Sequence, residues 1–183
     1  MKLDKHLVWI DLEMTGVDPA RDVILEIATI VTDNDLKLVA EGPNIAINQP
    51  EEVLSCMDDW CMTHHRASGL IDRAEASSFN CRDAEQRTLE FLQSHCEREK
   101  CPLCGNSVWQ DRRFIAKYMP SLSEFFHYRN IDVSSIKELA KRWYPSLPPF
   151  QKQKSHLALM DIKESVNELK YYRENIFLKT PAP

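Results

Sequence analysis

Residues 23–32, with the sequence VILEIATIVT, constrain the fold more than any other segment. The run is apolar and β-branched, and its length suits a strand buried within a sheet. Residues 7–13 form a shorter apolar run before it, and residues 36–47 continue the pattern after a turn at residues 33–35. Strands joined by such short turns pair in an antiparallel fashion. The beginning of the chain therefore predicts an antiparallel meander of three strands.

Helical periodicity replaces the strand pattern after Pro50. Helices are expected over residues 58–71, 82–96, 111–119, 122–127, 134–143 and 155–173, the last with Ser155 as its N-cap. One further strand is expected over residues 102–108. This order of elements predicts an α/β fold, in which helices pack on the faces of a mixed sheet. The length of 183 residues suits a single domain over residues 1–183, with residues 175–183 as a frayed tail.

Charge and hydropathy exclude several classes of protein. The formal net charge is −5, whereas proteins that coat long or duplex nucleic acid are usually strongly basic. No stretch approaches the roughly 18 consecutive apolar residues of a membrane span. Residues 1–6 are polar and lack the apolar core of a secretory signal. We therefore expect a cytoplasmic protein whose six cysteines are reduced thiols.

Two acidic residues end the first predicted strand. Asp11 and Glu13 are two positions apart, so in a strand both carboxylates point from the same face. Neighbouring carboxylates repel one another unless they share a proton or bind a cation. Taken alone, the pair leaves two interpretations open, a solvent-facing acidic edge and half of a metal site.

Three ordered motifs extend this pair. WIDLEMTG, residues 9–16, resembles the first motif of the DEDD exonuclease superfamily, and of the oligoribonucleases in particular. CGNSVWQDRRF, residues 104–114, resembles the second motif, with Asp111 as its acidic residue. HLALMD, residues 156–161, matches H-x-A-x-x-D, the third motif of the branch that carries a histidine. The resemblance covers residues 7–174 and implies a ribonuclease-H-like mixed sheet.

The four motif carboxylates explain how an acidic protein could hold a polyanion. Asp11, Glu13, Asp111 and Asp161 would carry a charge of −4 if they converged. Two Mg²⁺ or Mn²⁺ ions would cancel that charge, and hard oxygen ligands suit both ions. Such a pair, roughly 3.5–4 Å apart, can activate a water and stabilise the leaving oxygen of a phosphodiester. His156 is expected to be the general base, because imidazole titrates near working pH.

The resemblance also implies the substrate and the residues that bind it. Oligoribonucleases remove nucleoside 5′-monophosphates from the 3′ end of short oligoribonucleotides, especially dinucleotides. By resemblance, Val17 and Trp60 would wedge the terminal bases, although core packing is the usual role of a tryptophan on a helix. Ser107, Arg129 and Ser134 match positions that cap a 5′ phosphate. Tyr128 would reach the site of the partner subunit in a homodimer.

Other interpretations of these residues stay open. A DNA-proofreading exonuclease would share the four carboxylates and the histidine, and a catalytically silent module could bind nucleotides without cleaving them. Structural zinc could use His95, Cys96, Cys101 and Cys104, but no second C-x-x-C supports it. The adjacent pair His64 and His65 is expected to lie on a solvated helix surface, where neighbouring side chains diverge.

Overall fold

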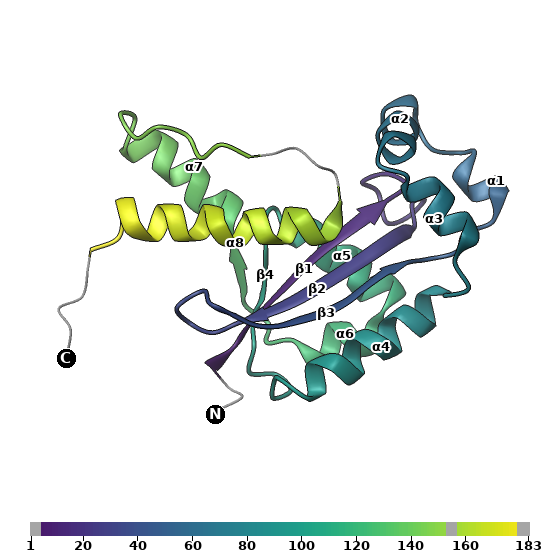
Figure 1. Cartoon of the computed structure of the whole chain (residues 1–183), viewed down its shortest axis with the longest axis horizontal. Helices are drawn as coiled ribbons and strands as arrows, with labels where there is room; N and C mark the ends of the chain where they lie inside the picture. The colour runs from purple at the N-terminus through teal and green to yellow at the C-terminus, as the bar shows by residue number, and fades with distance from the viewer. Residues whose placement is uncertain (1–4, 153–156, 179–183) are drawn as a thin grey trace.

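A computed structural model describes residues 5–152 and 157–178 of the chain. A five-stranded sheet lies between two groups of helices (Figure 1). The strands are β1 Leu7–Met14, β2 Ile24–Thr32, β3 Leu38–Ala46, β4 Leu103–Gly105 and β5 Asn130–Asp132, in the sheet order β3-β2-β1-β4-β5. The helices are α1 Glu51–Leu54, α2 Asp59–Ala67, α3 Leu70–Ala76, α4 Cys81–Gln93, α5 Trp109–Tyr118, α6 Pro120–Phe125, α7 Val133–Trp143 and α8 Ala158–Asn175.

The antiparallel meander predicted from the sequence is confirmed. β1 pairs with β2, and β2 pairs with β3, both in antiparallel register. All of β2 is buried, as its continuous apolar run predicted. β4 then pairs in parallel with β1, and β5 pairs in parallel with β4. The sheet is therefore mixed, with β1 at its centre, and the predicted α/β architecture is confirmed.

Alternation along β1 divides the core between the two faces of the sheet. Val8, Ile10 and Leu12 belong to the cluster packed by α4, α5 and α6. Leu7 and Trp9 belong to the cluster on the opposite face, which α7 and α8 cover. In Figure 1, α8 crosses this second face with its first turn near the end of β1. The odd-numbered residues of β1 thus face α8.

Several element boundaries differ from the sequence prediction. The single helix expected over residues 58–71 is two helices, α2 and α3, because Gly69 between them has a left-handed φ of 70°. The strand expected over residues 102–108 is limited to β4, and β5 and α1 were not predicted. The expected N-cap Ser155 lies outside the described residues, and α8 is described from Ala158. Within the described ranges, no helix has the length and hydropathy that crossing a membrane requires.

Candidate metal centre

Three of the four predicted carboxylates converge where β1 ends beneath α8. Asp11 and Glu13 occupy odd positions on β1, so they continue the face that Leu7 and Trp9 begin. Asp161 lies in the first turn of α8. One carboxylate oxygen from each of these three acids lies within 4.8 Å of the other two. Strand alternation and the packing of α8 on this face therefore bring together residues 150 positions apart.

Asp111, the fourth predicted carboxylate, joins the cluster through the backbone of β1. β4 pairs with β1 at Val8 and Trp9, before the two acids of the strand. Farther along, the backbone N–H of Leu12 donates a hydrogen bond to Asp111 Oδ1 at 3.0 Å. Asp111 is 6% exposed, so a buried carboxylate satisfies a strand N–H between Asp11 and Glu13.

Burial and mutual repulsion make this cluster unfavourable when it is ionised without a cation. Burial is the largest cause that raises the pKa of Asp11 well above its ordinary value, and the charge of Asp111 is the next. Burial likewise raises the pKa of Glu13 to about 7, with Asp161 as the strongest neighbouring charge. Burial also raises the pKa of Asp111 to about 7, although the bond from Leu12 opposes the rise. A bound cation would relieve each of these costs.

The donor set fits a hard divalent cation. Every side-chain donor in the cluster is a carboxylate oxygen, which Mg²⁺ and Mn²⁺ prefer, and thiolate or imidazole donors are not among the grouped atoms. Elsewhere in the described residues, no other three His, Cys, Asp or Glu side chains come close enough to share an ion. The zinc alternative is therefore not supported, and His95 Nδ1 instead bonds the carbonyl of Phe91.

Sequence reasoning missed an ion pair beside the metal centre. Glu26 on β2 lies directly opposite Glu13 on β1, and it is 1% exposed. Like charges at this spacing are destabilising. Arg73 on α3 forms a bidentate ion pair with the Glu26 carboxylate. Its charge also opposes the rise in the pKa of Glu13. No local pattern in the sequence indicates this pair, because the partners lie 47 positions apart.

The predicted solvent exposure of both histidines on α2 is wrong for His65. His65 is 3% exposed, and its Nε2 lies 2.8 Å from the carbonyl oxygen of Met14. Its Nδ1 lies 3.8 Å from Glu13 Oε2, so the ring packs against the metal centre. His64 is half-buried instead, and its ring stacks on Trp60 with centroids 3.9 Å apart. Because successive helical side chains diverge, only one of the two could reach β1.

The two apolar residues predicted to wedge bases are both exposed. Val17 is 73% exposed, and its loop is tied to α5 by a hydrogen bond from Gln110 to its carbonyl oxygen. Gly16 permits this turn, because a Cβ there would collide with the Asp22 carboxylate. Trp60 is 60% exposed on α2, so the usual expectation of core packing is wrong for this residue. Both side chains therefore present most of their surface to solvent.

Two of the predicted phosphate-binding residues lie side by side. Ser107 Oγ and Ser134 Oγ are 3.0 Å apart, although Ser107 lies in the loop between β4 and α5 and Ser134 lies on α7. Asp132 Oδ1 accepts the backbone N–H of each serine, at 3.0 Å and 2.9 Å. Ser107 has a φ of 53°, an uncommon conformation for a residue other than glycine. Such local strain is typical of functional sites and needs surrounding contacts to hold it.

Tyr128 and Arg129, two of the remaining predicted site residues, form no hydrogen bond to the paired serines within the described residues. Tyr128 and Arg129 lie in the loop before β5, where the Arg129 guanidinium packs over the Tyr128 ring at 4.8 Å. In the part of the chain that the structure describes, Arg129 forms no side-chain hydrogen bond to Ser107 or Ser134. Tyr128 is 70% exposed. The predicted general base, His156, lies outside the described residues.

Comparisons with known proteins agree with this geometry. Residues 8–169 match the family model described as Exonuclease. The oligoribonuclease of Shewanella loihica is 57% identical over 175 residues, which cover 95% of this chain and 97% of that protein. The oligoribonuclease of Marinobacter nauticus is 58% identical over 173 residues, which cover 94% of this chain and 96% of that protein.

Solved structures of more distant proteins share the fold. Exonuclease I from Methylocaldum szegediense superposes with a TM-score of 0.71 at 17% identity, covering 94% of this chain. Escherichia coli exonuclease I in complex with a dT13 oligonucleotide gives a TM-score of 0.70 at 14% identity, covering 94% of this chain. In each case the match spans 41% of the larger protein. The ribonuclease-H-like sheet expected from the motifs is thereby confirmed.

Proposed function

Because this chain belongs to the oligoribonuclease family of exonucleases, we propose that it cleaves short oligoribonucleotides, dinucleotides above all. It is a 3′-to-5′ exoribonuclease, and the products would be nucleoside 5′-monophosphates. The observation that carries the proposal is the convergence of Asp11, Glu13 and Asp161 within 4.8 Å, with Asp111 bonded to the strand between the first two. A silent binding module has no use for this costly cluster.

Exonucleases of this family use divalent metal ions, and we propose two Mg²⁺ or Mn²⁺ ions for this chain. Asp11, Glu13, Asp111 and Asp161 would hold the ions, which supply an activated water and charge stabilisation at the scissile phosphate. His156 would accept the proton of the attacking water, because it stands five positions before Asp161 in the third motif. The backbone N–H of Leu12 and the buried residues of β1 would keep the carboxylates oriented.

The substrate contacts follow from exposure and geometry. Val17 and Trp60 would wedge the two bases, since both present apolar surface to solvent. Ser107 and Ser134 would line the site of the 5′ phosphate, supported by the 3.0 Å separation of their hydroxyls; because the Ser134 hydroxyl donates to Asn106, the Ser107 hydroxyl would donate to the phosphate. Arg129 would add its charge from the neighbouring loop. A site closed at the phosphate would restrict the enzyme to very short chains.

The chain would act as a homodimer in the cytoplasm, with residues 1–183 as one domain and residues 175–183 as a tail. Tyr128 would reach the partner's site, and its exposed ring supports this role. Exposed Leu139 and Trp143 on α7 offer further apolar surface to a second copy. Burying such residues between two copies would be favourable.

A time course with end-labelled oligomers of graded length tests the proposal. Release of mononucleotides from an RNA dinucleotide should exceed release from a long single-stranded DNA, and a chelator should stop it. The variant Asp11→Ala is the inactive control, because it removes one ligand of the cluster. Preference for the long DNA would favour a proofreading-type exonuclease instead. Binding of the dinucleotide without any release would favour a silent module.

A further inference from the structure

Asn106 joins the paired serines to the helix that carries Asp161. The residue follows the last residue of β4, and it is half-buried. Its Oδ1 accepts a hydrogen bond from Ser134 Oγ at 3.1 Å. Its Nδ2 donates to Ser165 Oγ at 2.7 Å and to Glu168 Oε2 at 3.2 Å, both on α8. The acceptor and donor atoms of one amide therefore face two different parts of the site.

The α8 side of this bridge leads back to the metal centre. Ser165 is 3% exposed, and its Oγ donates to the carbonyl oxygen of Asp161 at 2.8 Å. A continuous line of hydrogen bonds therefore runs from Ser134 through Asn106 and Ser165 to the backbone of Asp161. Because each member has a defined donor and acceptor, the line fixes the orientation of the Asn106 amide.

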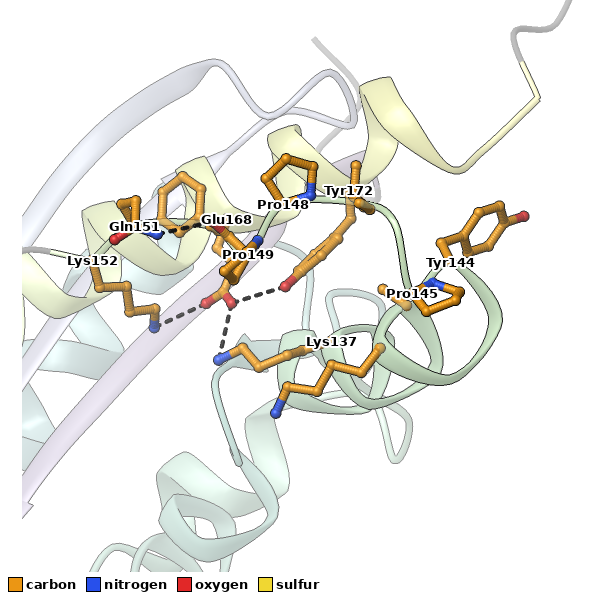
Figure 2. Close-up of a pocket in the computed structure, with 13 residues that line it drawn as sticks. Lys137, Tyr144, Pro145, Pro148, Pro149, Gln151, Lys152, Glu168 and Tyr172 are labelled. Carbon is orange, nitrogen blue, oxygen red and sulfur yellow. Dashed lines mark hydrogen bonds and ion pairs between the residues drawn. The ribbon is translucent and has the colours of Figure 1, made fainter.

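Glu168 makes the anchor on α8 rigid. This carboxylate is 1% exposed, and Figure 2 shows the groups that gather on it. Lys137 and Lys152 each place an ammonium nitrogen 2.9 Å from one of its oxygens, and Tyr172 donates to it at 3.3 Å. A buried, paired carboxylate of this kind keeps its position, because moving it would leave charge unpaired. Asn106 Nδ2 is thus held by a fixed acceptor.

The serine side of the bridge needs such support. Ser107 is held in a left-handed conformation, and its hydroxyl contacts Ser134. Asp132 fixes the backbone N–H groups of both serines but leaves their hydroxyls to other partners. Of the bonds described, the one from Ser134 Oγ to Asn106 is the one that connects the hydroxyl pair to α8.

We propose that Asn106 is a positioning residue, which holds the Ser107–Ser134 hydroxyl pair at a fixed offset from the metal centre. Hydrolysis would then depend on a 5′ phosphate one nucleotide away from the scissile bond. The inference rests on the proposed function, because it takes the serine pair as the phosphate contact. Asn106 does not touch the reacting atoms; it acts through Ser134.

The test compares two RNA dinucleotides that differ only in a 5′ phosphate. For the wild-type enzyme with Mg²⁺, KM should be about tenfold lower for the phosphorylated dinucleotide, as one charge-assisted hydrogen bond provides. In Asn106→Ala, KM for the phosphorylated dinucleotide should rise about tenfold. For the dinucleotide without a 5′ phosphate, KM and kcat should change less than about twofold. Equal losses on both substrates would show a merely structural role and overturn the proposal.

Two further variants keep the test decisive. Ser165→Ala removes one anchor of Asn106 and places a good helix former inside α8, so it should fold even if Asn106→Ala does not. In this variant the ratio of the two KM values should fall about threefold. A ratio equal to that of the wild-type enzyme would overturn the proposal. Asn175→Ala is the matched control, an exposed asparagine at the far end of α8 that should keep the wild-type preference.

The result for the wild-type enzyme tests the role of Asn106 and the proposed exonuclease function separately. If the wild-type enzyme cleaves both dinucleotides with the same KM, the serine pair does not bind the phosphate, and the role of Asn106 fails with it. The exonuclease assignment would stand in that case. If neither dinucleotide is cleaved, the proposed function itself is overturned.

Discussion

The substitution Glu13→Gln should stabilise the metal-free protein while it abolishes hydrolysis. Burial, followed by the charges of Asp161 and Glu26, raises the pKa of Glu13 from 4.5 to about 7. The ionised carboxylate is therefore unfavourable in the folded chain unless a cation is bound. Glutamine keeps the shape of the side chain and removes its charge, so it relieves the repulsion and also removes a metal ligand.

The sign and size of the effect follow from linkage. A raised folded-state pKa means that the contribution of Glu13 to stability is fully present below about pH 4.5 and is lost as the pH rises through about 7. At about 1.4 kcal/mol per pH unit, the loss is at most about 3 kcal/mol. Since the other acids remain, we expect a gain of about 1–3 kcal/mol above neutral pH. For a domain of this size that is a rise of about 3–10 °C in Tm.

Thermal unfolding in a chelator, near pH 8 and near pH 5, measures the effect. The gain should be present at the higher pH and about fourfold smaller at the lower one. Glu75→Gln, at an exposed glutamate on α3, is the matched control and should leave Tm unchanged. A variant no more stable than wild type at the higher pH, or equally stabilised at both, would refute the reasoning.

Three other predictions concern the same region. Affinity for Mg²⁺, measured by titration calorimetry, should fall as the pH is lowered through about 7, because protons compete for Glu13 and Asp111. Arg73→Met should lower the free energy of unfolding in urea by about 1–3 kcal/mol, because it leaves the buried Glu26 carboxylate without its partner. Trp60→Ala should raise KM for dinucleotides about tenfold in steady-state assays, because base stacking is worth about 1–3 kcal/mol per base. Its Tm should be unchanged, since the side chain is exposed.

Each of these predictions has a result that would contradict it. Affinity for Mg²⁺ that is constant between about pH 6 and 8 would mean that neither acid titrates there. An Arg73→Met protein as stable as wild type would show that the buried Glu26 carboxylate does not depend on Arg73 for its stability. A Trp60→Ala enzyme with wild-type KM would remove the ring from substrate binding, and a large drop in its Tm would assign it to the fold instead.

Local patterns were enough to predict the three antiparallel strands of the sheet and the shared face of Asp11 and Glu13. β2 is buried along its whole length, so its apolar run was visible in the sequence without knowledge of its neighbours. Asp11 and Glu13 share a face because the period of a strand is two, which requires only their spacing. The approach of Asp161 was inferred from the family motifs, since its distance from β1 in the sequence carries no local signal.

Contacts between distant segments could not be predicted. His65 is buried because α2 turns one of two adjacent histidines toward Met14, and the sequence does not specify which one. The break at Gly69 was missed because the apolar periodicity continues across it. β5 is three residues long, too short for a pattern, and it forms because β4 offers a parallel partner.

The register of β1 has a consequence for how such a chain can vary. Glu13 faces Glu26 across the β1–β2 ladder, and the pairing becomes irregular directly after it. A slip of one position would turn both acids toward the hydrophobic core under α4, α5 and α6, and it would turn Ile10 and Leu12 toward Asp161 on the opposite face. A single-residue insertion or deletion inside this strand would therefore turn the two carboxylates away from Asp161 in one step.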